Sequence, residues 1–195
     1  MHLTKDKKLF FILSFSMGLV VIASNYLVQF PVKFYNLENL LTYGAFSYPI
    51  TFLITDLANR KYGKIQARKI VYIGFLLGLL LTLFFSTNFQ DLISIRIAIG
   101  SGTAFLTAQL LDVQVFDKLR KSAWFVAPLA SSLLGSLVDT ILFFFISFYD
   151  TGLPWFSLAI GDFSVKVFIS LIMLIPFRLL LNKIRDESKA NLKTI

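Results

Sequence analysis

Residues 42–69 read TYGAFSYPITFLITDLANRKYGKIQARK. The first half of this stretch is apolar enough to enter a bilayer, although Pro49 interrupts it. A carboxylate, Asp56, then precedes a basic segment that contains Arg60, Lys61, Lys64, Arg68 and Lys69. An apolar segment that ends in clustered positive charge is typical of a membrane span that reaches the cytoplasm. The stretch therefore predicts a membrane protein and places this loop on the cytoplasmic side.

The composition of the whole chain agrees with a polytopic membrane protein. Of its 195 residues, 56% are hydrophobic, whereas soluble domains contain roughly 45–50%. The apolar residues recur along the chain and do not form one N-terminal block, as they would in a signal peptide. Cysteine is absent, and the single histidine is His2. We therefore expect no cofactor, no metal centre and no histidine-dependent intramembrane hydrolase.

Six apolar segments follow one another along the chain. They predict an all-α, polytopic protein whose residues 1–195 form a single membrane domain with six transmembrane helices, at about 9–30, 40–57, 70–90, 96–116, 124–148 and 155–177. Lys and Arg gather before the first span, in the second–third and fourth–fifth loops, and in the C-terminal tail. The positive-inside rule then places both termini in the cytoplasm. The net charge of +8 is therefore a signal of topology, and we expect no nucleic-acid partner.

Small residues predict where two of these helices approach closely. Gly74 and Gly78 form a GxxxG pair inside the third span. Such pairs allow two helix backbones to pack tightly in a membrane. We therefore interpret these glycines as packing residues and assign them no functional role.

Ionisable side chains inside the predicted spans are the strongest functional signal. A charged residue at the centre of a transmembrane helix costs about 3 kcal/mol on insertion scales, so such residues usually face the bundle interior. Asp139 has no cation within one turn on its own helix, and Lys166 is the only cation well inside a span. We therefore expect Asp139 to contact Lys166 or a ligand. Asp162 lies one turn before Lys166, and the two could simply neutralise each other.

The candidate residues fall into two groups by their expected role. The candidate substrate-binding residues are Asp139, Lys166, Asn25, Gln29, Gln109 and Asp162. The candidate gating or coupling residues near the cytoplasmic face are Asp112, Asp56 and Arg60. Pairing of Asp56 and Asp112 with the basic loops is the plain structural alternative. The pattern favours a small-molecule transporter or its substrate-binding subunit. An intramembrane enzyme that uses an Asp pair for acid–base chemistry is less favoured.

Five stretches of the chain resemble a known family. They are SNYLVQFPV (24–32), YGAFSYPITFLITDLANRKYG (43–63), RIAIGSGTAFLTAQLLDVQVFDKLRK (96–121), WFVAPLASSLLGSLVDTILFFFISF (124–148) and VKVFISLIMLIPF (165–177). Together they resemble the queuosine precursor transporters, also called the vitamin uptake transporter family. The resemblance implies a six-span protein of the bacterial inner membrane. It also implies import of 7-deazaguanine precursors, such as 7-cyano-7-deazaguanine, for the tRNA modification queuosine.

The chemistry of such a substrate fits the buried polar residues. A deazaguanine presents a ring N–H beside an exocyclic amino group, and one carboxylate can accept both hydrogen bonds. Asp139 is our first choice for this role, and Lys166 could donate to the substrate or hold Asp139 ionised. Asn25, Gln29 and Gln109 could meet the remaining edge.

The sequence leaves the energy source and the assembly open. A proton-coupled carrier could use Asp139 or Asp112, whereas a facilitator would need no such group. A substrate-binding subunit of an energy-coupling vitamin uptake system would need a separate ATPase, because the chain has no Walker motif. The expected partners are a purine-like small molecule, the lipid bilayer and, as an open alternative, further copies of the chain.

Overall fold

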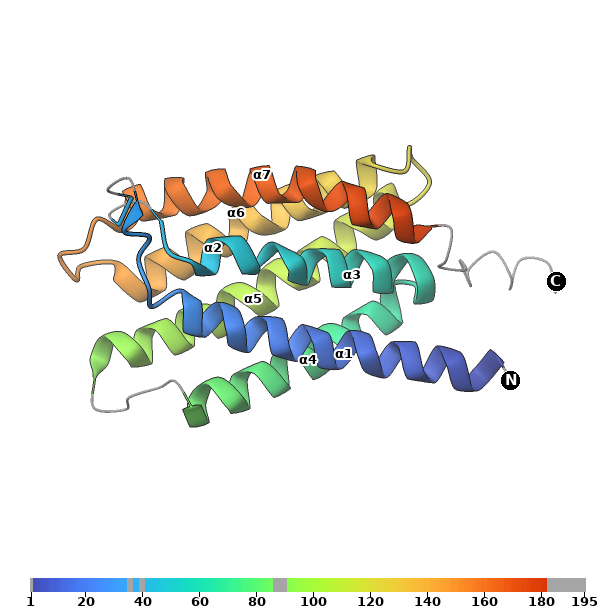
Figure 1. The fold of residues 1–195 in the computed structure, drawn as a ribbon, viewed down its shortest axis with the longest axis horizontal. Helices are drawn as coiled ribbons and strands as arrows, with labels where there is room; N and C mark the ends of the chain where they lie inside the picture. Colours follow the sequence, from blue (N-terminus) through green and yellow to red (C-terminus); the bar gives the residue numbers. More distant parts are fainter. Residues whose placement is uncertain (1, 35–36, 39–40, 86–90, 182–195) are drawn as a thin grey trace.

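Seven helical segments make up the fold in the described part of the chain (Figure 1). The computed structural model describes residues 2–34, 37–38, 41–85 and 91–181. Its helices are α1 (His2–Leu27), α2 (Gly44–Ser47), α3 (Pro49–Tyr62), α4 (Lys64–Phe85), α5 (Leu92–Leu119), α6 (Val126–Phe148) and α7 (Trp155–Leu181). The only strand-like feature in these residues is an isolated bridge between Pro31 and Thr42. The predicted all-α class is confirmed.

Four of the described helices are long and apolar enough to cross a membrane. They are α1 from Lys7 onward, α5, α6 and α7. The predicted span at 40–57 begins at a residue outside those described, and the span at 70–90 ends among such residues. The multi-pass character is therefore confirmed, whereas the number of six spans stays a prediction.

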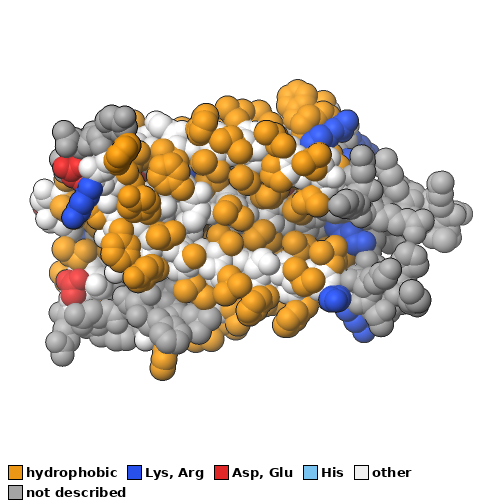
Figure 2. Space-filling model, viewed as in Figure 1, with side chains coloured by type: hydrophobic (Ala, Val, Ile, Leu, Met, Phe, Trp, Pro, Cys, Tyr) orange, Lys and Arg blue, Asp and Glu red, His pale blue; other side chains and the backbone are white. Residues whose placement is uncertain are grey.

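The long helices run alternately up and down the bundle (Figure 1). The N-terminal end of α1, the α3–α4 turn, the α5–α6 loop and the C-terminal end of α7 lie at one end. Most of the visible Lys and Arg side chains gather at this end, whereas apolar side chains cover the middle of the same face (Figure 2). Phe11, Phe84 and Phe168 are among the exposed large apolar side chains of the bundle. Such a large apolar surface suits contact with lipid.

Pro49 divides the second predicted span into α2 and α3. Proline has no backbone N–H and therefore interrupts the hydrogen-bond ladder of a helix. Tyr48 lies between the two segments with helical backbone angles, φ −58° and ψ −40°. Its carbonyl accepts a 2.9 Å bond from the N–H of Thr51, only three residues further along. The interruption places Tyr48 inside the bundle, where its side chain is buried.

The two glycines of α4 pack directly against α1. Gly74 lies against Met17, and Gly78 lies against Val21. A Cβ atom added at Gly78 would lie only 2.6 Å from Cγ1 of Val21, which is closer than side chains can approach. The prediction that the GxxxG pair serves packing is confirmed.

Candidate functional site

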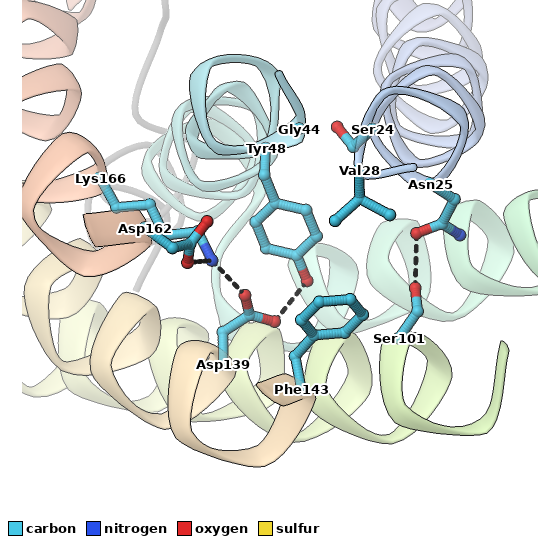
Figure 3. A pocket seen from close by; sticks show the side chains of 10 residues that line it. All are labelled: Ser24, Asn25, Val28, Gly44, Tyr48, Ser101, Asp139, Phe143, Asp162 and Lys166. Atoms are coloured by element: carbon cyan, nitrogen blue, oxygen red, sulfur yellow. Dashed lines mark hydrogen bonds and ion pairs between the residues drawn. The ribbon is translucent and has the colours of Figure 1, made fainter. Parts of the chain in front are cut away.

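A small cavity of about 30 Å³ lies where α1, α2, α5, α6 and α7 meet (Figure 3). Ligand pockets combine apolar walls with a few placed polar groups. This cavity, called the central cavity below, has that character. It is lined by Ser24, Asn25, Val28, Gly44, Tyr48, Ser101, Asp139, Phe143, Asp162 and Lys166.

A buried ionic network forms one wall of the central cavity. The Nζ atom of Lys166 lies 2.7 Å from Oδ2 of Asp139 on α6 and 2.5 Å from Oδ2 of Asp162 on its own helix. Thr140 donates a 2.8 Å hydrogen bond to Asp162 and accepts one of 3.2 Å from Lys166. The predicted contact between Asp139 and Lys166 is therefore present, and the i,i+4 pair of α7 forms as well.

Tyr48 completes this network from a third element. Its hydroxyl donates a 2.7 Å hydrogen bond to Oδ1 of Asp139. The Nζ atom of Lys166 lies 4.9 Å from the centre of its ring, within the range of a cation–π contact. Sequence reasoning missed Tyr48, although its position directly before the interrupting Pro49 was a usable signal. The α2–α3 junction, α6 and α7 therefore meet at one group of side chains.

The charge balance of the network favours a ligand with hydrogen-bond donors. Asp139 and Asp162 supply two carboxylates, whereas Lys166 supplies one ammonium group. All three side chains are buried. When both acids are ionised, one negative charge remains without a cation of its own in the described site. A buried charge is stabilised only by further pairing and hydrogen bonds. Donors on a ligand would supply them.

The opposite wall of the central cavity joins α1 to α5. Ser101 donates a 2.5 Å hydrogen bond to Oδ1 of Asn25. Figure 3 shows this pair across the cavity from Asp139, with Val28 and Phe143 between the two polar groups. The structure therefore brings four predicted residues into one cavity: Asp139, Lys166, Asp162 and Asn25.

Two other predicted residues lie outside the central cavity. Gln29 is exposed, because α1 ends at Leu27 and the chain no longer follows the helix face that carries Asn25. Gln109 is fully buried between α5 and α3. It donates a 2.7 Å hydrogen bond to Thr51 and accepts one from Thr55. Neither glutamine therefore faces the ionic network.

Two of the three predicted gating or coupling residues, Asp56 and Asp112, form a second group. Asp56 accepts hydrogen bonds from Ser131 (3.1 Å) and Ser132 (3.4 Å), and it interacts electrostatically with Asp112. Among the described residues, neither acid has a cation partner, so pairing with the basic loops is not seen there. Asp112 is 0% exposed, and neither of its carboxylate oxygens has a hydrogen-bond partner in the described residues.

Arg60 does not join these acids. Its guanidinium donates a 3.1 Å hydrogen bond to the carbonyl of Arg120, at the end of α5. Arg120 in turn lies 3.7 Å from the carboxylate of Asp117. The arginine therefore ties the α3 end to the α5–α6 loop, and Asp56 and Asp112 remain a separate acidic pair.

Comparison with known proteins identifies the family. The family model described as "Putative vitamin uptake transporter" matches residues 42–181. The "Queuosine precursor transporter" of Escherichia coli K12 is 37% identical, over 96% of this chain and 95% of that protein. The "Probable queuosine precursor transporter" of Haemophilus influenzae is 36% identical, over 84% and 82%. A protein of the same name from Bacillus subtilis is 29% identical, over 80% and 78%. No solved structure matches the chain.

The family match covers every helix that lines the central cavity except α1. The matched range includes α2 to α7, and the Escherichia coli alignment extends over nearly the whole chain. The recognition made from the sequence motifs is therefore confirmed. The chain is a multi-pass membrane protein that belongs to the vitamin uptake transporter family, a family of transporters and not of enzymes.

Proposed function

We propose that this protein imports 7-deazaguanine precursors of queuosine, such as 7-cyano-7-deazaguanine, and binds them in the central cavity. The name and the 37% identity of the Escherichia coli relative support this substrate class. The observation that carries the proposal is the buried carboxylate of Asp139, which lines the cavity and is held in place by Lys166 and Tyr48.

The carboxylate of Asp139 has acceptor sites for two more hydrogen bonds. An ionised carboxylate offers about four lone-pair sites. Tyr48 occupies one site on Oδ1, and Lys166 occupies one site on Oδ2. The adjacent ring N–H and amino group of a deazaguanine can therefore bind both oxygens without displacing either partner. Lys166 pairs with this carboxylate, and hydrogen bonds to an ionised carboxylate are stronger than neutral ones.

The remaining lining suits a flat, polar ring. Phe143 and the ring of Tyr48 supply aromatic surface against which a planar heterocycle can pack. Asn25 supplies an amide across the cavity from Asp139. In the proposed site, the donor edge of the substrate therefore binds Asp139 and the opposite edge lies near Asn25.

The direction of import follows from the proposed orientation. We place the end of the bundle that carries the α3–α4 turn in the cytoplasm, because Lys and Arg gather there. Both termini and the Asp56–Asp112 pair then belong to the cytoplasmic half, and six spans cross the bacterial inner membrane. Substrate from outside would reach the central cavity first.

Binding of the substrate class is expected to raise the thermal stability of the purified protein in detergent. A ligand at about 100 times its Kd adds about 2.7 kcal/mol to the free energy of unfolding. 7-Cyano-7-deazaguanine should therefore raise the melting temperature in a concentration-dependent manner. Adenine is the control, because it lacks the adjacent pair of donors. Equal stabilisation by adenine, or none by the deazaguanine, would contradict the proposed substrate class.

We assign proton coupling to Asp112, because its buried carboxylate has no hydrogen-bond partner in the described residues. An isolated ionised carboxylate is costly to bury, so such a group takes up a proton. Asp56 on α3 is the acid that interacts electrostatically with Asp112. The guanidinium of Arg68 on α4 donates a hydrogen bond to the side chain of Gln114. An acid-outside pH gradient should accelerate uptake into proteoliposomes severalfold for wild type and not for Asp112→Asn. Equal acceleration in both would refute this role.

A further inference from the structure

A second, smaller cavity, of about 10 Å³, lies further along the helices that line the central cavity. We call it the inner cavity. Its polar lining consists of Asp56, Ser132 and Ser170, and Leu53, Met173 and Phe177 are among its apolar lining residues. It therefore has the same mixed character as the central cavity, including one buried carboxylate.

The two cavities are lined by successive turns of the same three elements. On α7, Lys166 lines the central cavity, and Ser170, about 6 Å further along the helix, lines the inner one. On α6, Asp139 and Ser132 lie about 10 Å apart in the same way. On the broken span, Tyr48 precedes Pro49 and Asp56. The cavities are therefore in line along the bundle, and the inner cavity lies toward the basic end.

Tyr48, Asp139 and Lys166 contact one another in the wall of the central cavity. Each of these residues comes from a different element, so the contact closes the space between the α2–α3 junction, α6 and α7. A movement at the interruption before Pro49 would displace Tyr48 and open this space. Broken helices at a substrate site are a recurrent feature of secondary transporters.

Two buried hydroxyl groups, those of Ser136 and Ser170, lie on the helices α6 and α7 that line both cavities. Ser136 lies on α6 between Ser132 and Asp139 and is fully buried, and Ser170 is 5% exposed. In the described residues, neither hydroxyl has a hydrogen-bond partner. Buried polar groups are normally satisfied, so each exception needs an explanation. Water or a polar ligand that passes along α6 and α7 would satisfy both.

We propose that the inner cavity is a second binding station for the same class of substrate, a planar heterocycle with adjacent N–H donors. Asp56 supplies the acceptor there, as Asp139 does in the central cavity. The substrate passes between the two stations along α6 and α7 when the contact around Tyr48 opens. This inference rests on the proposed function and adds a route to it.

Cysteine labelling tests the route directly, because the natural chain contains no cysteine. Ser170→Cys places a thiol in the inner cavity and removes a hydroxyl that has no partner in the described residues. Ser164→Cys is the matched control on α7, because Ser164 is exposed on the outer surface of the helix. A charged, membrane-impermeant thiosulfonate reacts with ionised thiols in contact with water. Both variants are labelled in proteoliposomes from each side, with and without 7-cyano-7-deazaguanine.

We expect Ser170→Cys to react from the cytoplasmic side roughly tenfold faster than Ser164→Cys. The proposed route brings water to the Ser170 position, and only a thiol in contact with water ionises. Saturating substrate should slow this labelling, since the bound molecule occupies the cavity. Ligand-dependent thermal stabilisation is measured on the same variants. If Ser170→Cys still binds substrate but reacts no faster than Ser164→Cys in every condition, the inner station is refuted. If the substrate does not stabilise the unlabelled wild-type protein, the proposed function is refuted instead.

Discussion

Replacement of Asp139 by asparagine is expected to abolish substrate binding while leaving the protein folded. The amide keeps the shape of the carboxylate, but it presents an NH2 group to a substrate edge that also donates. Hydrogen bonds to charged groups are worth about 1.5–3 kcal/mol each, so the loss of two should lower affinity by at least about a hundredfold. Lys166 still pairs with Asp162 in the variant, so no unpaired charge is created.

The matched control for this variant is Asp91→Asn. Asp91 is exposed at the start of α5, where its side chain accepts hydrogen bonds from the backbone N–H groups of Ile93 and Ser94. Asparagine serves equally well at such a helix N-terminus. Equilibrium dialysis with labelled 7-cyano-7-deazaguanine should therefore give wild-type affinity for Asp91→Asn. If Asp139→Asn also bound the substrate with wild-type affinity, a residue other than Asp139 would have to anchor it.

Replacement of Lys166 by methionine is expected to cause the largest loss of stability of any single change in the cavity. Methionine keeps most of the volume, but it leaves Asp139 and Asp162 buried without their cation. Removal of one partner from a buried ion pair typically costs about 3–5 kcal/mol. The melting temperature in detergent should fall accordingly. Lys118→Met, at an exposed position of α5, should leave it unchanged.

A double variant separates the lost charge balance from lost packing. Lys166→Met combined with Asp162→Asn removes one of the two orphaned acids, and Thr140 can still hydrogen-bond to the new amide. Because the residues contact each other, their effects should not be additive. The double variant should therefore melt above Lys166→Met alone. A double variant less stable than the single one would show that the network is held by packing and not by charge.

Much of this arrangement can be predicted from the sequence, because charges in apolar helices have few stable solutions. Asp139 has no cation within one turn on its own helix, so contact with Lys166 or with a ligand was expected, and the contact with Lys166 is present. The interruption at Pro49 follows from its missing N–H in the same way. Both predictions rest on local chemistry that does not depend on how the helices are rotated about their axes.

The location of the predicted site residues that lie outside the central cavity depends on helix rotation and on helix ends. Gln29 follows Asn25 by four positions, but α1 ends between them; Gln29 is exposed and donates a 3.4 Å hydrogen bond to the carbonyl of Asn25, whereas the Asn25 side chain is buried. Gln109 lies on α5 like Ser101, yet it faces Thr51 and Thr55 on α3 and not the central cavity. Periodicity shows which residues share a face, but only the packing of the whole bundle decides which helix that face meets.

Uptake of labelled 7-cyano-7-deazaguanine into proteoliposomes that contain only this chain tests the central claim most directly. Without ATP or any partner protein, wild type should accumulate the label well above empty vesicles, and Asp139→Asn should not exceed them. This result would also exclude a need for a separate ATPase. Uptake by Asp139→Asn at the wild-type rate, or no uptake by wild type, would contradict the claim that the chain itself carries deazaguanines through the Asp139 cavity.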